Sequence, residues 1–147
     1  DGSALFVADW GGHKILQVEA TTGAVTTLAG SGDEGSGDGV GGAAQFHYPR
    51  GVALSPDGGA LFVADFCNHQ IRRVEVATGA VTTVAGSGVR GSTNGVGGAA
   101  QFYNPSDVAI STDGSALFVA DDDNHKIRRV EVATGAVTTV AGSSTEG

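Results

Sequence analysis

The chain has 147 residues and a mass of 14.5 kDa, about the size of one ordinary domain. Hydrophobic residues make up 40% and charged residues 16%, a balance too apolar for a disordered chain even with 25 glycines. No apolar run approaches the roughly 18 residues of a membrane-spanning helix. Eight Lys and Arg against 16 Asp and Glu give a net charge of -8, which repels phosphate backbones. We therefore expect a packed core, and neither a membrane nor a nucleic-acid partner.

Cysteine content and the chain start give little information about the compartment. The single cysteine, Cys67, cannot form a disulfide within the chain, so the fold must be stabilised by packing alone. The sequence starts at Asp1 with no signal-peptide pattern and contains no N-glycosylation sequon. An extracellular location is slightly favoured over a cytoplasmic one. The absence of methionine leads us to expect part of a longer protein.

A repeat of 56 residues dominates the sequence. The segment Leu-Phe-Val-Ala-Asp begins at Leu5, again at Leu61 and again at Leu117. Residues 57–87 and 113–143 align over 31 positions and differ at only four of them. We predict a single unit over residues 1–147, made of repeat 1 (1–56), repeat 2 (57–112) and a partial repeat 3 (113–147).

Each repeat contains short runs of strand-forming residues bounded by turn residues, and none has a helical period. In chain order the predicted strands of one unit are 52–55 (a), 61–64 (b), 71–76 (c) and 80–85 (d), and strand a recurs at 108–111. Pro56-Asp57-Gly58 and Ala77-Thr78-Gly79 supply turns between them. Four short antiparallel strands per unit predict the blades of a β-propeller.

Several spaced motifs recur in register and carry a family resemblance. Val-Ala-Asp-x-x-Asn-His-x-Ile occurs at 63–71 and 119–127, and is followed by Ala-Thr-Gly-Ala-Val-Thr-Thr-Val-Ala-Gly; Ala-x-Phe-x-x-Pro occurs at 100–105. Over essentially its whole length the chain resembles the NHL-repeat family, although Gly12-His13 replaces the Asn-His of the later copies. The resemblance implies a propeller, commonly six-bladed. The family includes protein- and RNA-binding platforms, bacterial kinase sensor domains and a peptidyl lyase, so it implies a fold and not one function.

The predicted strands describe an incomplete ring. We expect an all-β propeller segment of about three four-stranded antiparallel blades, eleven strands in all, in which the first blade lacks its innermost strand a. Apolar blade faces would then be exposed at both ends, which isolated repeats tolerate poorly. We expect either a longer natural chain or copies that associate blade to blade. Two copies would supply six blades, and a contact that does not close would give a filament.

Variation between the repeats gathers in two kinds of loop. In a four-stranded meander the b–c and d–a loops lie on one face, and binding residues usually occupy such displayed loops. Aromatic and charged residues on these loops are the predicted binding residues: Trp10, His47, Tyr48, Arg50, Phe66, Tyr103, Asp122 and Asp123. We expect a protein or peptide partner, with a glycan as an alternative. The competing interpretation is a surface free to vary.

The Asp-x-x-x-His spacing, as in Asp65 and His69, combines two common metal ligands. Because it recurs in every repeat, a structural role is favoured: the Asp accepts backbone N–H groups and the His bridges to a neighbouring strand. The acidic run 121–123 is a further cation candidate, although a solvated loop is favoured there too.

Three other features are assigned structural roles. Gly-x-Gly-x-x-Gly at 30–35 follows a strand but opens no helix, so we predict no phosphate site. Arg72-Arg73 and Arg128-Arg129 lie on strand c beside Glu75 and Glu131, which predicts a cross-strand charge ladder. Cys67 has no basic neighbour in sequence and is predicted to be an inert thiol.

The sequence therefore predicts a non-enzymatic binding or scaffold module that uses its b–c and d–a loop face and needs no cofactor or metal. Two alternatives remain open. One is a self-assembling ring or filament, and the other is a lyase-like enzyme with a channel metal held by histidines of several blades.

Overall fold

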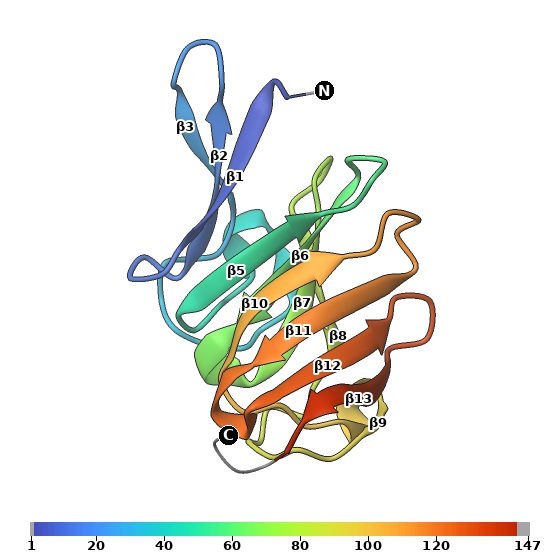
Figure 1. The fold of residues 1–147 in the computed structure, drawn as a ribbon. Coiled ribbons are helices and arrows are strands. Elements are labelled where there is room, and N and C mark those ends of the chain that lie inside the picture. Colours follow the sequence, from blue (N-terminus) through green and yellow to red (C-terminus); the bar gives the residue numbers. More distant parts are fainter. Residues whose placement is uncertain (1, 144–147) are drawn as a thin grey trace.

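The computed structural model describes residues 2–143, which form three antiparallel sheets (Figure 1). Blade 1 has the strand order β1-β2-β3, blade 2 β4-β8-β7-β6-β5, and blade 3 β10-β11-β12-β13-β9. The strand bounds are β1 Ala4–Asp9, β2 Lys14–Glu19, β3 Val25–Ala29, β4 Gly39–Val40, β5 Pro49–Leu54, β6 Ala60–Asp65, β7 Gln70–Glu75, β8 Ala80–Ala85, β9 Gly95–Val96, β10 Pro105–Ile110, β11 Ala116–Asp121, β12 Lys126–Glu131 and β13 Ala136–Gly142.

Four 3₁₀ turns complete the described elements: η1 Gly41–Ala43, η2 Phe66–Asn68, η3 Gly97–Ala99 and η4 Asp122–Asn124. The blades lie side by side, with β5 and β10 in contact and with β1 beside β5 (Figure 1). The all-β propeller segment is thus confirmed, including a first blade that lacks strand a. The predicted strands a to d correspond in blade 2 to β5, β6, β7 and β8.

All eleven predicted strands are present, and blades 2 and 3 each contain one additional short strand that the sequence pattern did not predict. The two-residue strands β4 and β9 each add a fifth strand at the outer edge, where Val40 pairs with Ala80 and Val96 with Ala136. Both lie in glycine-rich connections that have no strand periodicity, so the sequence pattern did not reveal them. We call residues 30–48 and 86–104 connectors 1 and 2. Each leaves one blade and pairs with the next.

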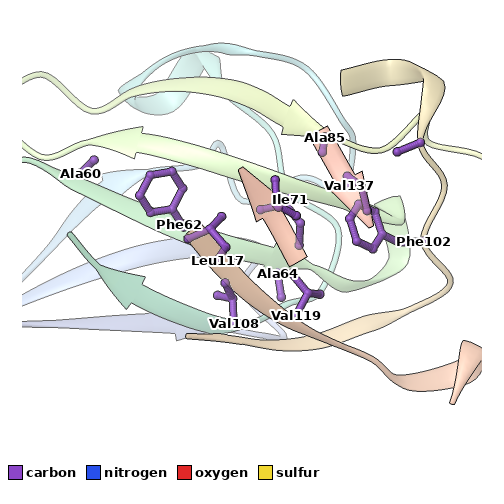
Figure 2. Packing of buried hydrophobic residues seen from close by; sticks show 12 residues of the cluster. Ala60, Phe62, Ala64, Ile71, Ala85, Phe102, Val108, Leu117, Val119 and Val137 are labelled. Carbon is purple, nitrogen blue, oxygen red and sulfur yellow. The ribbon is translucent and has the colours of Figure 1, made fainter. Parts of the chain in front are cut away.

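Strand alternation gives every blade two apolar faces. In blade 2 the phenylalanine face carries Phe62, Ala64, Ile71 and Ala85, and the leucine face carries Leu61, Val63, Val74 and Val81. The phenylalanine face of blade 1 packs on the leucine face of blade 2. That of blade 2 packs on the leucine face of blade 3, where Phe62 and Ile71 meet Leu117 and Val119 (Figure 2). The core is therefore two slabs between neighbouring blades, and each fully buried large side chain contributes about 1.5–3 kcal/mol.

Arg72 and Arg128 correct the predicted charge ladder, because both side chains are fully buried. Arg72 lies on the leucine face opposite Val63, where its Nη1 donates to Asp65 Oδ2 at 2.8 Å and its Nη2 donates to Asp38 Oδ1 at 2.8 Å. Further acceptors are main-chain carbonyls of connector 1. The guanidinium is buried because a connector some 30 residues earlier in the chain supplies its acceptors. Of the predicted ladder, Arg129 and Glu131 form an ion pair near the surface. They lie on the same strand, with Arg129 Nη1 3.8 Å from Glu131 Oε2.

Candidate binding face

The b–c turns and the connector ends lie on one side of the blades and form the loop face, residues 9–13, 47–50, 65–69, 103–106 and 121–125. In blades 2 and 3 each b–c turn is one turn of 3₁₀ helix followed by a histidine in the left-handed region, with φ of 55° at both His69 and His125. This geometry reverses the chain within three residues. In blade 2 it also directs the His69 ring to the connector end that opens blade 3.

Aspartate and histidine of these turns fix the connector ends. Asp65 Oδ1 accepts the backbone N–H of His47 at 2.9 Å, while His13 Nδ1 of the preceding blade accepts that of Tyr48 at 3.1 Å. Connector 2 repeats the pattern, with Tyr103 bound to Asp121 and Asn104 bound to His69. The structural role predicted for the Asp-x-x-x-His motif is therefore confirmed. Two consecutive amides clamp each connector to two blades at once.

Tyr48 has an unusual backbone for an aromatic residue. Its φ is 53°, in the left-handed region, whereas the equivalent position in connector 2 is Asn104, a residue type that tolerates this conformation better. The conformation brings the Tyr48 ring to 4.3 Å from the Trp10 ring and 4.5 Å from the His13 ring, centroid to centroid. Trp10 remains 52% exposed. The left-handed backbone of Tyr48 thus places its ring in an aromatic cluster that presents the large Trp10 ring to solvent.

Arg50 lies beside this cluster on the first strand of blade 2. Its guanidinium lies 4.8 Å from the centre of the Phe66 ring, a cation–π arrangement. Trp10 and Arg50 together line a shallow hollow of about 370 Å³. Within residues 2–143 the Arg50 guanidinium has no carboxylate partner. The hollow therefore offers a flat apolar ring next to an unpaired positive charge.

His47 joins the aromatic cluster from the connector. Its ring centroid is 5.2 Å from that of Tyr48, and its Nε2 lies 3.2 Å from Glu34 Oε2. Glu34 comes from the start of connector 1, so one loop supplies both partners. The Glu34 carboxylate places a negative charge beside the His47 ring.

The blade 3 part of the loop face is more polar. Tyr103 packs against His69, with ring centroids 5.7 Å apart, and its hydroxyl accepts a 3.3 Å hydrogen bond from Arg90. Asn104 Nδ2 donates to Asp123 Oδ2 at 2.5 Å. Burial is the largest influence on the pKa of His69 and, together with nearby Arg90, lowers that pKa. His69 therefore stays neutral at neutral pH and keeps Nδ1 available as an acceptor.

The eight predicted binding residues thus fall into groups. Trp10, His47 and Tyr48 form the aromatic cluster, and Arg50 and Phe66 form the neighbouring pair. Tyr103 and Asp123 belong to the blade 3 part, and Asp122 is exposed beside them. Sequence reasoning missed the contributions of Glu34 and Arg90 to this face, because both come from connector positions distant from the turns that they join.

The described residues offer little support for metal binding or for a reactive thiol. No group of three or more His, Cys, Asp or Glu side chains within residues 2–143 is arranged to hold a metal ion. Burial, followed by the nearby Asp65 and Glu34 carboxylates, raises the pKa of the Cys67 thiol, in line with the inert thiol expected from the sequence. None of the described helices has the length and apolar character to cross a bilayer.

Comparison with known proteins gives a consistent family match. The sequence profile of the NHL repeat matches residues 46–74. Human NHL repeat-containing protein 2 is 35% identical over 146 residues, and the Arabidopsis thaliana chloroplastic protein SUPPRESSOR OF QUENCHING 1 is 34% identical over 139 residues. These alignments cover 92% and 88% of this chain. The chain spans about a fifth of the length of the first relative (20%) and 13% of the second.

Solved structures agree on the fold. A nutrient binding protein from Bacteroides ovatus superposes with a TM-score of 0.76 at 23% identity, over 95% of this chain and 36% of that chain. A chain of a nidogen–laminin complex superposes with a TM-score of 0.69 at 15% identity, over 95% of this chain and 44% of that one. The repeat motifs, the profile match and the blade architecture agree, and the chain belongs to the NHL-repeat family.

Proposed function

We propose that the chain is a non-enzymatic binding module whose loop face recognises a protein or peptide, with a glycan as the alternative ligand. The observation that carries the proposal is Tyr48 in a left-handed conformation, stacked on the exposed Trp10 ring. Strained residues persist where the surrounding structure holds them, and they gather at functional sites. An asparagine at this position, as in connector 2, would avoid the strain.

The residue types and the charge around the hollow between Trp10 and Arg50 also favour a binding role for this part of the loop face. Trp, Tyr and Arg are the residue types most enriched at binding hot spots, and all three meet around the hollow between Trp10 and Arg50. The cluster sits on turns clamped by buried Asp65 and by His13, so little order is gained on binding. A ligand that combines a carboxylate with a flat apolar group would match Arg50 and Trp10.

A direct test uses the fact that Trp10 is the only tryptophan of the chain. Peptides selected from a phage-displayed random library on the immobilised chain would be titrated while the Trp10 fluorescence is followed. We expect saturable fluorescence changes with the wild-type chain. The variant in which Trp10, Tyr48 and Phe66 are replaced together by alanine has no tryptophan, so its binding is measured by isothermal titration calorimetry. We expect that binding to be lost while circular dichroism shows that the fold is retained. A glycan array probed with the same two proteins tests the alternative ligand.

The matched control is Tyr103→Ala, which removes an aromatic residue from the blade 3 part of the loop face. Peptides that recognise the aromatic cluster should bind this variant with unchanged affinity. Selected peptides that still bind the triple variant would contradict the proposal.

A further inference from the structure

Two apolar faces of the molecule remain uncovered, at opposite ends of the row of blades (Figure 1). On the phenylalanine face of blade 3, Phe118 is 39% and Ile127 is 42% exposed, whereas their blade 2 equivalents Phe62 and Ile71 are 2% and 0% exposed. The difference arises because blade 3 covers the blade 2 residues and nothing in residues 2–143 covers those of blade 3.

The leucine face of blade 1 is uncovered in the same way. Leu5 is 57%, Val7 42% and Val25 57% exposed. The blade 2 equivalents, Leu61, Val63 and Val81, are at most 2% exposed, because they pack against blade 1. Each end of the molecule therefore displays one half of an interface that is formed twice inside it.

The two uncovered halves have matching residue types. Blade 3 displays the Phe, Ala, Ile, Val and Ala set that packs between blades 2 and 3: Phe118, Ala120, Ile127, Val140 and Ala141 repeat Phe62, Ala64, Ile71, Val84 and Ala85. Blade 1 displays the Leu, Val, Val, Val set that covers such a face: Leu5, Val7, Val18 and Val25 repeat Leu117, Val119, Val130 and Val137. The apolar side chains that strands b, c and d contribute to the internal interface therefore recur at the two ends, whereas the connector residues Ala100 and Phe102 and the strand a residue Val108 of the internal cluster have no counterpart there.

Blade 1 differs from the other two blades in the residue at one position of its leucine face, where it has Leu16. Leu16 pairs with Val7, as Arg72 pairs with Val63 and Arg128 with Val119. The two arginines are buried only because a preceding connector supplies carbonyl and side-chain acceptors. Leu16 needs no such acceptors, so the leucine face of blade 1 can be covered by a bare blade face without an accompanying connector.

We propose that the phenylalanine face of blade 3 packs against the leucine face of blade 1 of a second copy of this chain, head to tail. The contact repeats the blade-to-blade part of the packing between blades 2 and 3, without the connector residues. Because the two surfaces differ, the contact is heterologous: it closes into a ring if the rotation allows and extends if it does not. Two copies supply six blades. The inference depends on the blade faces and is independent of any ligand on the loop face.

The experiment is the mass of the purified chain measured by light scattering over a concentration series. We expect a mass of at least twice 14.5 kDa that falls toward 14.5 kDa on dilution. Phe118→Asp and Leu5→Asp should each shift the particle to the single-chain mass, because each destroys one half of the contact. The matched control is Val96→Asp, which places the same charge on the edge strand β9 and should keep the wild-type mass. Val96 is expected to lie outside the contact, because its blade 2 equivalent Val40 remains 59% exposed although blade 3 packs on blade 2.

Mixing the two variants tests the head-to-tail geometry. Phe118→Asp retains a sound blade 1 face and Leu5→Asp a sound blade 3 face, so an equimolar mixture should form pairs of twice 14.5 kDa and nothing larger. Failure to pair would overturn the proposal, as would a single-chain mass for the wild type at about 1 mM, which places the dissociation constant above that value. Circular dichroism verifies folding. If either variant fails to fold, Ile127→Asp and Val7→Asp replace them on the same two faces.

Discussion

His69 Nδ1 accepts the backbone N–H of Asn104 at 3.0 Å, and this hydrogen bond joins the b–c turn of blade 2 to the connector end that opens blade 3. The bond requires a neutral imidazole, because a protonated Nδ1 carries a hydrogen and cannot accept. Burial, and then Arg90, lowers the pKa of His69 in the folded chain below the ordinary histidine value of 6.5. The native state therefore resists protonation at this site.

The free energy of unfolding should fall as the pH falls below about 6.5, since the unfolded chain then binds a proton at His69 more readily than the folded chain. The contribution of His69 is fully present above that pH and is lost toward the lowered folded pKa. Urea denaturation at a series of pH values measures it, with His69→Asn as the reference, because Asn tolerates the left-handed backbone and retains an acceptor without titrating. Identical pH profiles for the two proteins would contradict the assignment.

Removal of the buried Arg72 should lower the free energy of unfolding by about 3–5 kcal/mol, because Asp65 is left buried without its cation. Arg72→Leu reproduces the residue found at position 16 and therefore removes the charge with a side chain that fits a leucine face. The double variant with Asp65→Asn should recover part of the loss. Urea denaturation checks both values, and a single variant as stable as the wild type would show that the ion pair contributes nothing to stability.

Tyr48→Asn should change the stability of the fold only slightly. The substitution relieves left-handed strain of about 1–3 kcal/mol and removes ring stacking of about 0.5–1.5 kcal/mol per pair, so stability should change by only about 1 kcal/mol. Tyr48→Ala is the matched control, because it loses the stacking without gaining tolerance of the backbone, and it should be the less stable variant. Thermal denaturation ranks the two, and equal stability would mean that the Tyr48 backbone is not strained.

Gly79 lies in the c–d turn of blade 2, which approaches the preceding blade closely. Its φ is 75°, and an added Cβ would lie 2.6 Å from the carbonyl oxygen of Leu28. Gly79→Ala should therefore destabilise the chain well beyond the roughly 1 kcal/mol expected from the backbone alone. Gly23→Ala in blade 1 is the control, because its φ is 72° with open space around the Cβ. Equal losses in the two variants, measured in urea, would show that the blade contact adapts.

Cys67 should react slowly with iodoacetamide at neutral pH, because burial and then Asp65 and Glu34 raise the pKa of its thiol from 9.0. The pH at which the alkylation rate reaches half its maximum should lie above that of the same chain unfolded in urea. The ratio of the two rates at pH 8 is the measurement. A thiol that reacts faster when folded would indicate an activating environment that the structure does not show.

Local patterns predicted the strands and the family well, whereas contacts between distant segments were not accessible from the sequence. The alternation in Leu61–Asp65 and its copies is a period-two signal, so β6 and β11 were found within one residue. The short β4 and the burial of Arg72 depend on partners about 30 to 40 residues away. The strained backbone of Tyr48 has no local signal either. The loop face was predicted because meander topology alone places b–c and d–a loops together.

The connectors have a consequence for how such chains change length. Each connector carries a pairing strand and the acceptors for the arginine of the following blade. The side-chain acceptor is Asp38 in connector 1 and Asn94 in connector 2, each 2.8 Å from an arginine Nη2. A 56-residue unit that is duplicated in frame would therefore bring its own pairing strand and its own acceptors. We expect the number of blades in such chains to change in whole units of this kind.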